Sequence, residues 1–126
     1  MVVVRGLAEL VDNPAAIVIV PSPNLAPAGA LPYRWLAPGG DEKILDAASN
    51  LIVERLSTEG PLGFLPNPEG DWTLWAEPVR ADPGPAVGAL GVVRRGTVEW
   101  SDSDAALVRT FASMCGSMWS KTSAGY

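Results

Sequence analysis

The chain has 126 residues, of which 48% are hydrophobic and 18% are charged, and it carries a net charge of −5. This length and composition predict one folded domain over residues 1–126 and exclude a disordered chain. The acidic balance argues against nucleic acid as a partner, because binding a polyanion requires a clustered basic face and the nine Lys and Arg residues are scattered. Their only adjacent pair, Arg94-Arg95, is typical of a solvated strand end.

Two scarce residue types restrict the chemistry of the chain. It contains no histidine, which removes the commonest metal ligand, the usual general base at neutral pH and the usual haem ligand. Its single cysteine, Cys115, excludes an internal disulfide. The sequence shows neither a signal-peptide pattern nor the run of about 20 apolar residues that a membrane span requires. We therefore predict a cytoplasmic protein that has no metal site and no membrane partner.

Three segments have the apolar spacing and the boundary signals of α-helices. The dipeptide Asn13-Pro14 ends the first, because a residue before proline avoids the helical conformation. Asp41 is placed to cap the second, whose apolar side chains form one stripe. Ser101 and Asp104 begin the third with the spacing of a capping box. The expected helices are residues 1–13, 41–57 and 101–121, and the expected tail is residues 122–126.

Five segments are typical of β-strands, at residues 15–20, 31–36, 62–65, 72–79 and 86–95. The first reads AAIVIV without polar alternation, which indicates a central strand buried on both faces. Pro32 indicates an edge position for the second, and Pro78 indicates an edge or a bulge in the fourth. Gly88 and Gly91 mark bulges or close backbone approach in the last. The order of the elements predicts an α+β fold, with an antiparallel sheet of about five to six strands and helices packed on its faces.

Several segments resemble patterns of the GAF domain family. Residues 58–62 (TEGPL) resemble its "tGepl" turn, and residues 74–79 (LWAEPV) are similar to its "llavPl" strand. Residues 87–93 (VGALGVV) resemble the "vlGvLvl" strand, and residues 98–104 (VEWSDSD) resemble the "pfteeD" start of the last helix. Residues 15–20 fit the first strand. The resemblance spans most of the chain and is closest from Thr58 onward.

This resemblance implies a PAS-like fold and a small-molecule-sensing or regulatory module of a signalling or transcription-regulatory protein. Such domains dimerise through their terminal helices. The chain lacks the Asn-Lys-Phe-Asp-Glu constellation of the cyclic-nucleotide subtype, and without histidine it lacks a haem ligand of that kind. Cys115 lies away from the position of bilin-attaching cysteines, and the methionine sulfoxide reductases of this fold use more than one cysteine. We therefore expect no haem, bilin or metal cofactor, and no enzymatic activity.

Four side chains are candidates for a ligand pocket, because aromatic residues are enriched in such sites: Tyr33, Trp35, Trp75 and Glu77. Glu77 interrupts an apolar strand, so it either faces solvent by alternation or points into the pocket. The proline-rich segment 21–30 is either a connector between strands or a lid. We expect the ligand on the side of the sheet opposite the last helix.

The last helix has an apolar face wider than one stripe requires, which suggests that a second copy of the chain covers part of it. The expected interface residues of this homodimer are Leu7, Leu10, Val108, Cys115 and Trp119. Without a histidine to activate it, Cys115 is expected to pack rather than to act as a nucleophile. The alternative to a ligand-binding module is a degenerate GAF-like or roadblock-like scaffold without a ligand, which acts only in protein–protein interaction.

Overall fold

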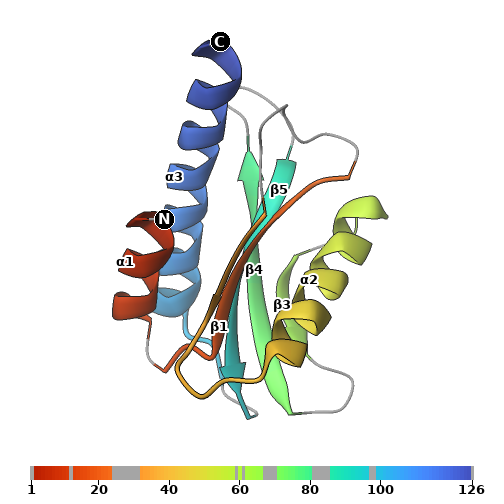
Figure 1. The fold of residues 1–126 in the computed structure, drawn as a ribbon, viewed down its shortest axis with the longest axis vertical. Helices are drawn as coiled ribbons and strands as arrows, with labels where there is room; N and C mark the ends of the chain where they lie inside the picture. The colour runs from red at the N-terminus through yellow and green to blue at the C-terminus, as the bar shows by residue number, and fades with distance from the viewer. Residues whose placement is uncertain are drawn as a thin grey trace.

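An antiparallel sheet of five strands lies between two layers of helices in the computed structural model of the protein (Figure 1). The structure describes residues 2–11, 13–23, 32–58, 60, 62–66, 71–80, 86–96 and 99–125, without the side chains of residues 2–4, 66 and 118–125. Its elements are α1 (Val2–Leu10), β1 (Ala16–Pro21), β2 (Tyr33–Leu36), α2 (Glu42–Ser57), β3 (Gly63–Pro66), β4 (Trp72–Arg80), β5 (Ala86–Arg95) and α3 (Asp102–Gly125). The predicted α+β fold with an antiparallel sheet is confirmed.

The strands are arranged in the order β2-β1-β5-β4-β3, so β1 and β5 lie near the middle of the sheet. Every residue of β1 from Ala16 to Val20 is buried, which confirms the central strand predicted from its unbroken apolar run. β2 is an edge strand, as Pro32 indicated. β4 is an interior strand, and its pairing with β5 shifts register between Val79 and Arg80. Of the two possibilities raised by Pro78, the structure therefore shows an irregularity rather than an edge.

One face of the sheet is covered by α2, which packs on β1, β5 and β2 (Figure 1). The carboxylate of Asp41 accepts a hydrogen bond of 2.9 Å from the backbone N–H of Lys43, which confirms the predicted cap. The buried residues of α2 are Leu45, Ala48 and Ile52. A Cβ atom on Gly91 would lie 2.7 Å from Cδ1 of Ile52, so glycine allows close packing between this helix and β5.

The opposite face is covered by α3, with α1 packed against α3 (Figure 1). A Cβ atom on Gly116 would lie 2.3 Å from the carbonyl oxygen of Arg80, so the backbones of α3 and β4 touch there. Helix α3 continues to Gly125 and includes residues 122–125, which the sequence analysis assigned to a tail. The difference has a simple cause, because no proline interrupts this segment and each added residue gains one backbone hydrogen bond.

Candidate functional site

The four residues expected to form a ligand pocket lie on one face of the sheet, the face that α1 and α3 cover. Pairing across the sheet gives two rows of neighbouring residues, Trp35, Ile17, Val92 and Trp75 in one and Tyr33, Ile19, Leu90 and Glu77 in the other. Directly paired residues project from the same face. Because Ile17 and Val92 belong to the same buried cluster as Val108 of α3, both rows face that helix. The expectation that these residues lie opposite the last helix is therefore wrong.

The structure does not bring these four residues together. Tyr33 and Trp35 lie on β2, whereas Trp75 and Glu77 lie on β4, with β1 and β5 between the two pairs. Three interstrand spacings separate β2 from β4, which amounts to roughly 14 Å. The rows between the pairs consist of buried aliphatic side chains, and the three aromatic residues pack against this core.

Glu77 contacts protein groups rather than open solvent, since its side chain is only 13% exposed. It accepts a hydrogen bond of 3.3 Å from the indole Nε1 of Trp75 on the same strand. Its Oε1 atom also lies 3.4 Å from Nη2 of Arg109, which is an exposed residue of α3. Glu77 therefore links β4 to the helix that covers it.

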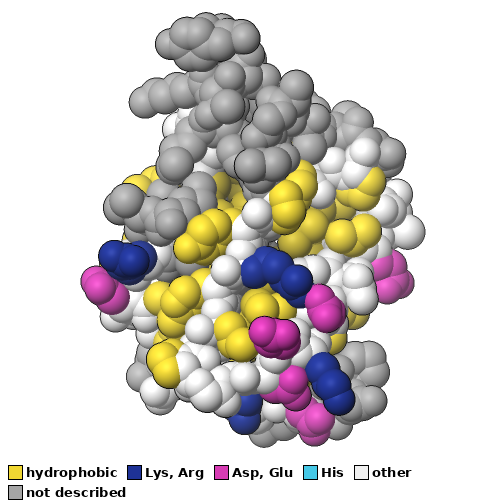
Figure 2. Space-filling view, in the orientation of Figure 1, with side chains coloured by type: hydrophobic (Ala, Val, Ile, Leu, Met, Phe, Trp, Pro, Cys, Tyr) yellow, Lys and Arg dark blue, Asp and Glu magenta, His cyan; other side chains and the backbone are white. Residues whose placement is uncertain are grey.

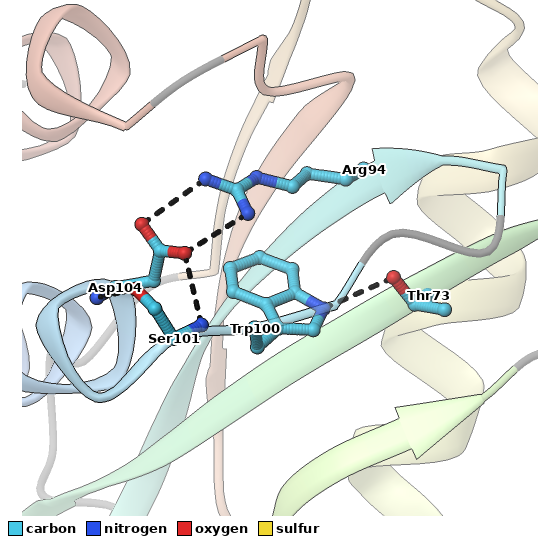
Figure 3. Close-up of polar contacts among 5 residues, drawn as sticks. All are labelled: Thr73, Arg94, Trp100, Ser101 and Asp104. Carbon is cyan, nitrogen blue, oxygen red and sulfur yellow. Dashed lines mark hydrogen bonds and ion pairs between the residues drawn. The ribbon is translucent and has the colours of Figure 1, made fainter.

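A second and more buried connection joins the sheet to the start of α3 (Figure 3). Arg94, at the end of β5, forms two parallel hydrogen bonds with the carboxylate of Asp104, at 3.1 and 3.2 Å. Its guanidinium carbon lies 4.4 Å from the centre of the Trp100 ring, within the range of a cation–π contact. The indole of Trp100 donates a hydrogen bond of 3.0 Å to the hydroxyl of Thr73 on β4. We call Arg94, Asp104, Trp100 and Thr73 the α3 anchor.

Asp104 also closes the first turn of α3. Its carboxylate accepts a hydrogen bond from the backbone N–H of Ser101, and its own N–H donates to the Ser101 hydroxyl, both at 3.1 Å. The predicted capping box is therefore confirmed. Burial raises the pKa of Asp104, but the hydrogen bonds from Arg94 and Ser101, together with the charge of Arg94, outweigh burial and hold the pKa below its usual value of 3.8.

Arg94 is only 5% exposed, so the prediction of a solvated strand end is wrong for this residue. Its neighbour Arg95 is exposed, as expected. Alternation alone does not distinguish the two arginines, because Val92 and Val93, which stand two residues before them, are both fully buried. Arg94 projects with Val92 from the face that α3 covers. An arginine at such a position requires a partner, and the acidic start of the following helix supplies Asp104.

The expected interface residues divide into buried and exposed groups. Leu7, Val108 and Cys115 have no exposed surface, because they belong to one buried cluster in which α1, α3 and the sheet pack together within the same chain. The helices meet closely, since a Cβ atom on Gly6 would lie 3.3 Å from the ring of Phe111. The width of the apolar face of α3 thus follows from packing against both the sheet and α1.

Two apolar side chains on these helices do reach solvent. Leu10 of α1 is 63% exposed, and Met114 of α3, which the sequence analysis did not select, is 45% exposed. The side chain of Trp119 lies outside the described residues. Among the described side chains of these helices, Leu10 and Met114 are therefore the large apolar ones open to a second copy, whereas Leu7, Val108 and Cys115 are not.

Cys115 is held in apolar surroundings. Burial raises the pKa of its thiol from 9.0 to about 11, so the thiol stays protonated at neutral pH and is a poor nucleophile. Among the described residues, no three His, Cys, Asp or Glu side chains are grouped so that they could hold a metal ion. No helix in the described part of the chain is both long and apolar enough to cross a membrane.

The charges on the surface are mixed in sign. In the view of Figure 2, the described Lys and Arg side chains are spread out, and Asp or Glu side chains lie close to them. One such pair joins Arg34 of β2 to Asp46 of α2. This face therefore does not present the clustered basic surface that nucleic acid binding requires.

A scan against protein-family models found no match, and neither did searches of curated proteins and of solved structures.

Proposed function

We propose that the protein is a non-catalytic, GAF-like regulatory module, and that α3 is the element through which it acts. The observation that carries the proposal is the way α3 is held. Its first turn is fixed to the sheet by the α3 anchor, and its last turns extend beyond the ends of β4 and β5 (Figure 1). A helix that is fixed at one end and extends past the described strands at the other is suited to carry a change in the domain to a partner.

The proposed partner is a second copy of the chain, which would contact the exposed apolar residues of the terminal helices. Leu10 and Met114 are two of the three large hydrophobic side chains recorded as exposed among the described residues. The third, Phe64, lies on β3 at an edge of the sheet. Large exposed apolar side chains on two packed helices favour association, because their burial removes apolar surface from water.

The high pKa of Cys115 supports a non-catalytic role. No other nucleophile in the described residues is activated by a neighbouring histidine, since the chain contains none. Regulation would therefore depend on binding and association rather than on a chemical step.

A specific observation favours a second candidate, a roadblock-like scaffold without a ligand. The four residues expected to line a pocket are separated across the sheet, and the three aromatic ones pack against the core. A scaffold of this kind would act by association alone, with both faces of its sheet filled by side chains.

Light scattering tests association. We expect the protein to have twice its chain mass of 13.2 kDa, and the variants Leu10→Asp, Met114→Asp and Trp119→Asp to return it to the mass of one chain. The matched control is Phe64→Asp, which places the same charge on an exposed apolar residue outside the terminal helices and should leave the mass unchanged. A single-chain mass for the unaltered protein would refute the homodimer.

A thermal-shift screen against nucleotides, amino acids and lipids separates the two candidates. A compound that raises the melting temperature in a saturable manner supports the sensory module, because a ligand that binds only the folded state stabilises it. A dimer that responds to none of the compounds supports the scaffold. A monomer that responds to none contradicts both.

A further inference from the structure

A hollow of about 460 Å³ opens between the first turns of α2 and the ends of two strands. Figure 1 shows why these elements meet, since α2 and β4 begin at the same end of the molecule, where β5 ends. Its described lining consists of Asp41, Lys43, Ile44, Ala47, Asp71, Trp72 and Arg95. This volume is within the range of small-molecule sites in proteins. None of these residues belongs to the pocket expected from the sequence.

The hollow has an apolar side. Trp72 is paired directly with Arg95 across β4 and β5, so both side chains project toward α2. Trp72 is only 4% exposed and belongs to the core cluster beneath α2, which gives the hollow a rigid aromatic base. Ile44 and Ala47 of α2 add aliphatic surface that is partly exposed.

The hollow also carries charges of both signs for which the described residues supply no ion pair. The carboxylate of Asp41 is engaged in capping α2. For the side chains of Lys43, Asp71 and Arg95, the described residues supply no ion pair or hydrogen bond, in contrast to Arg34, Arg94 and Arg109, which each contact a carboxylate. Two cations and one anion therefore remain available around one apolar surface.

We propose that this hollow binds a small apolar zwitterion, with an aliphatic α-amino acid as the ligand class. Arg95 and Lys43 would bind the carboxylate, because charge-assisted hydrogen bonds from a guanidinium suit a carboxylate well. Asp71 would bind the ammonium group, and the aliphatic side chain would lie against Trp72 and Ile44. An anion without an ammonium group would leave Asp71 unpaired, and an amine without a carboxylate would face two cations. This proposal names a ligand class for the sensory module described above. Binding of the amino acid does not depend on the proposed function, but a regulatory effect of that binding does.

An NMR titration with L-leucine tests the site directly. We expect saturable shifts of the backbone resonances of Asp71, Trp72 and Arg95. Two probes separate the parts of the ligand, since isocaproate lacks the ammonium group and isoamylamine lacks the carboxylate. Each should bind at least about tenfold more weakly than leucine, because each loses one charge-assisted interaction.

Matched variants connect the binding to the charges. Arg95→Gln and Asp71→Asn should each weaken leucine binding by about tenfold or more. Their controls, Arg5→Gln and Glu9→Gln, make the same chemical changes on exposed residues of α1 and should leave the affinity unchanged. All four positions are exposed, so the variants should fold, and circular dichroism checks this.

Absence of saturable shifts with leucine overturns the site, as does equal binding by the variants and their controls. Neither result bears on the homodimer, which light scattering measures separately. Conversely, leucine binding that leaves the mass and the α3 resonances unchanged supports the site and contradicts its regulatory role. The failure of the site and the failure of the proposed function are thus distinguishable.

Discussion

The two faces of the sheet are packed by different means. On the α2 face, the buried cluster consists of apolar side chains, mainly aliphatic, with Trp72 at one end, and the ion pair that joins Arg34 to Asp46 of α2 is exposed. On the face covered by α1 and α3, a similar apolar cluster is joined by two polar connections, the α3 anchor and the contact between Glu77 and Arg109. The anchor is largely buried, since the side chains of Arg94 and Asp104 are 6% and 23% exposed.

This difference determines how well each helix is oriented. Apolar packing is non-directional, and an exposed ion pair such as Arg34–Asp46 adds little to it, so a helix held mainly by apolar contacts tolerates small changes in position when side chains repack. The paired hydrogen bonds between Arg94 and Asp104 have a fixed planar geometry that allows one arrangement of strand end and helix start. The α3 anchor thus fixes the orientation of α3 on the sheet. On the other face, the packing mainly requires that the side chains beneath α2 fill the available space. This asymmetry supports the proposal that the protein acts through α3.

The largest expected effect comes from removing the anchor. Arg94→Met retains most of the volume but leaves the Asp104 carboxylate without its partner, and we expect a loss of about 2–3 kcal/mol in the free energy of unfolding. Ile52→Val on the α2 face removes one methyl group from a fully buried side chain and should cost about 1 kcal/mol. Urea denaturation of both variants measures the difference.

A double-mutant cycle shows whether the loss belongs to the pair. In the variant Arg94→Met/Asp104→Asn, the second change should cost much less than it does in the unaltered protein, because its partner is already absent. Arg94→Met/Ile52→Val should be additive. If Arg94→Met costs no more than Ile52→Val, the contrast between the two faces does not hold.

Glycine substitutions should give the next largest loss in the free energy of unfolding. The loss should differ between the two faces, because the new Cβ atom contacts backbone on one face and a side chain on the other. In Gly116→Ala it meets the backbone oxygen of Arg80, which no side-chain movement can relieve, so we expect a loss of about 2 kcal/mol. In Gly91→Ala it meets Cδ1 of Ile52 at 2.7 Å, which is the end of a side chain, and the expected loss is about 1 kcal/mol.

The Gly91 contact can be partly relieved. Gly91→Ala/Ile52→Val removes the atom that clashes, so the double variant should lose less stability than the two single losses added together. A simple sum would show that the strain at Gly91 arises elsewhere, for example at Leu74, whose Cδ1 atom would lie 2.8 Å away.

The sequence predicts those features of the fold that depend on residues close together in the chain. The strands, the cap at Asp41 and the capping box at Ser101 follow from short patterns, and the structure confirms them. The order of the strands in the sheet and the covering of α3 by α1 depend on contacts between distant segments. For this reason Leu7 and Val108 were expected at an interface and instead lie in the core.

The candidate site was harder to predict than the fold. Trp35 and Trp75 were selected by residue type, but only the strand order shows that two strands separate them. The hollow at α2 was missed because Lys43, Asp71 and Arg95 come from three separate segments of the chain with no shared motif. Alternation along β5 places Arg94 on the same face as Val92, and the acidic start of the following helix was the signal for its partner.

Low pH should weaken the α3 anchor, with a smaller effect on the free energy of unfolding than the substitutions above. The pKa of Asp104 in the folded protein lies below its unfolded value, so its contribution to stability is present at neutral pH and is lost as the pH falls through the folded pKa, below 3.8. We therefore expect the difference in the free energy of unfolding between the unaltered protein and Asp104→Asn to shrink from neutral pH to about pH 3. The difference between the unaltered protein and Ile52→Val should stay constant, and a parallel decline in both would contradict this origin.

The smallest structural perturbation is chemical labelling of Cys115, which reports how often α3 leaves the sheet. The thiol is buried and its pKa is about 11, so alkylation by iodoacetamide near pH 8 requires opening of the helix and should be at least about a hundredfold slower than in the denatured chain. Arg94→Met should accelerate labelling, because the anchor opposes this opening.

Ile52→Val should accelerate it only to the extent that it promotes global unfolding, since α2 covers the other face. When labelling rates are plotted against the measured stabilities, Arg94→Met should lie above the line for global unfolding and Ile52→Val on it. If both variants lie on that line, α3 opens only when the whole domain unfolds. The anchor would then stabilise the domain without controlling α3 independently, and a ligand in the hollow beneath α2 could influence α3 only through the sheet between them.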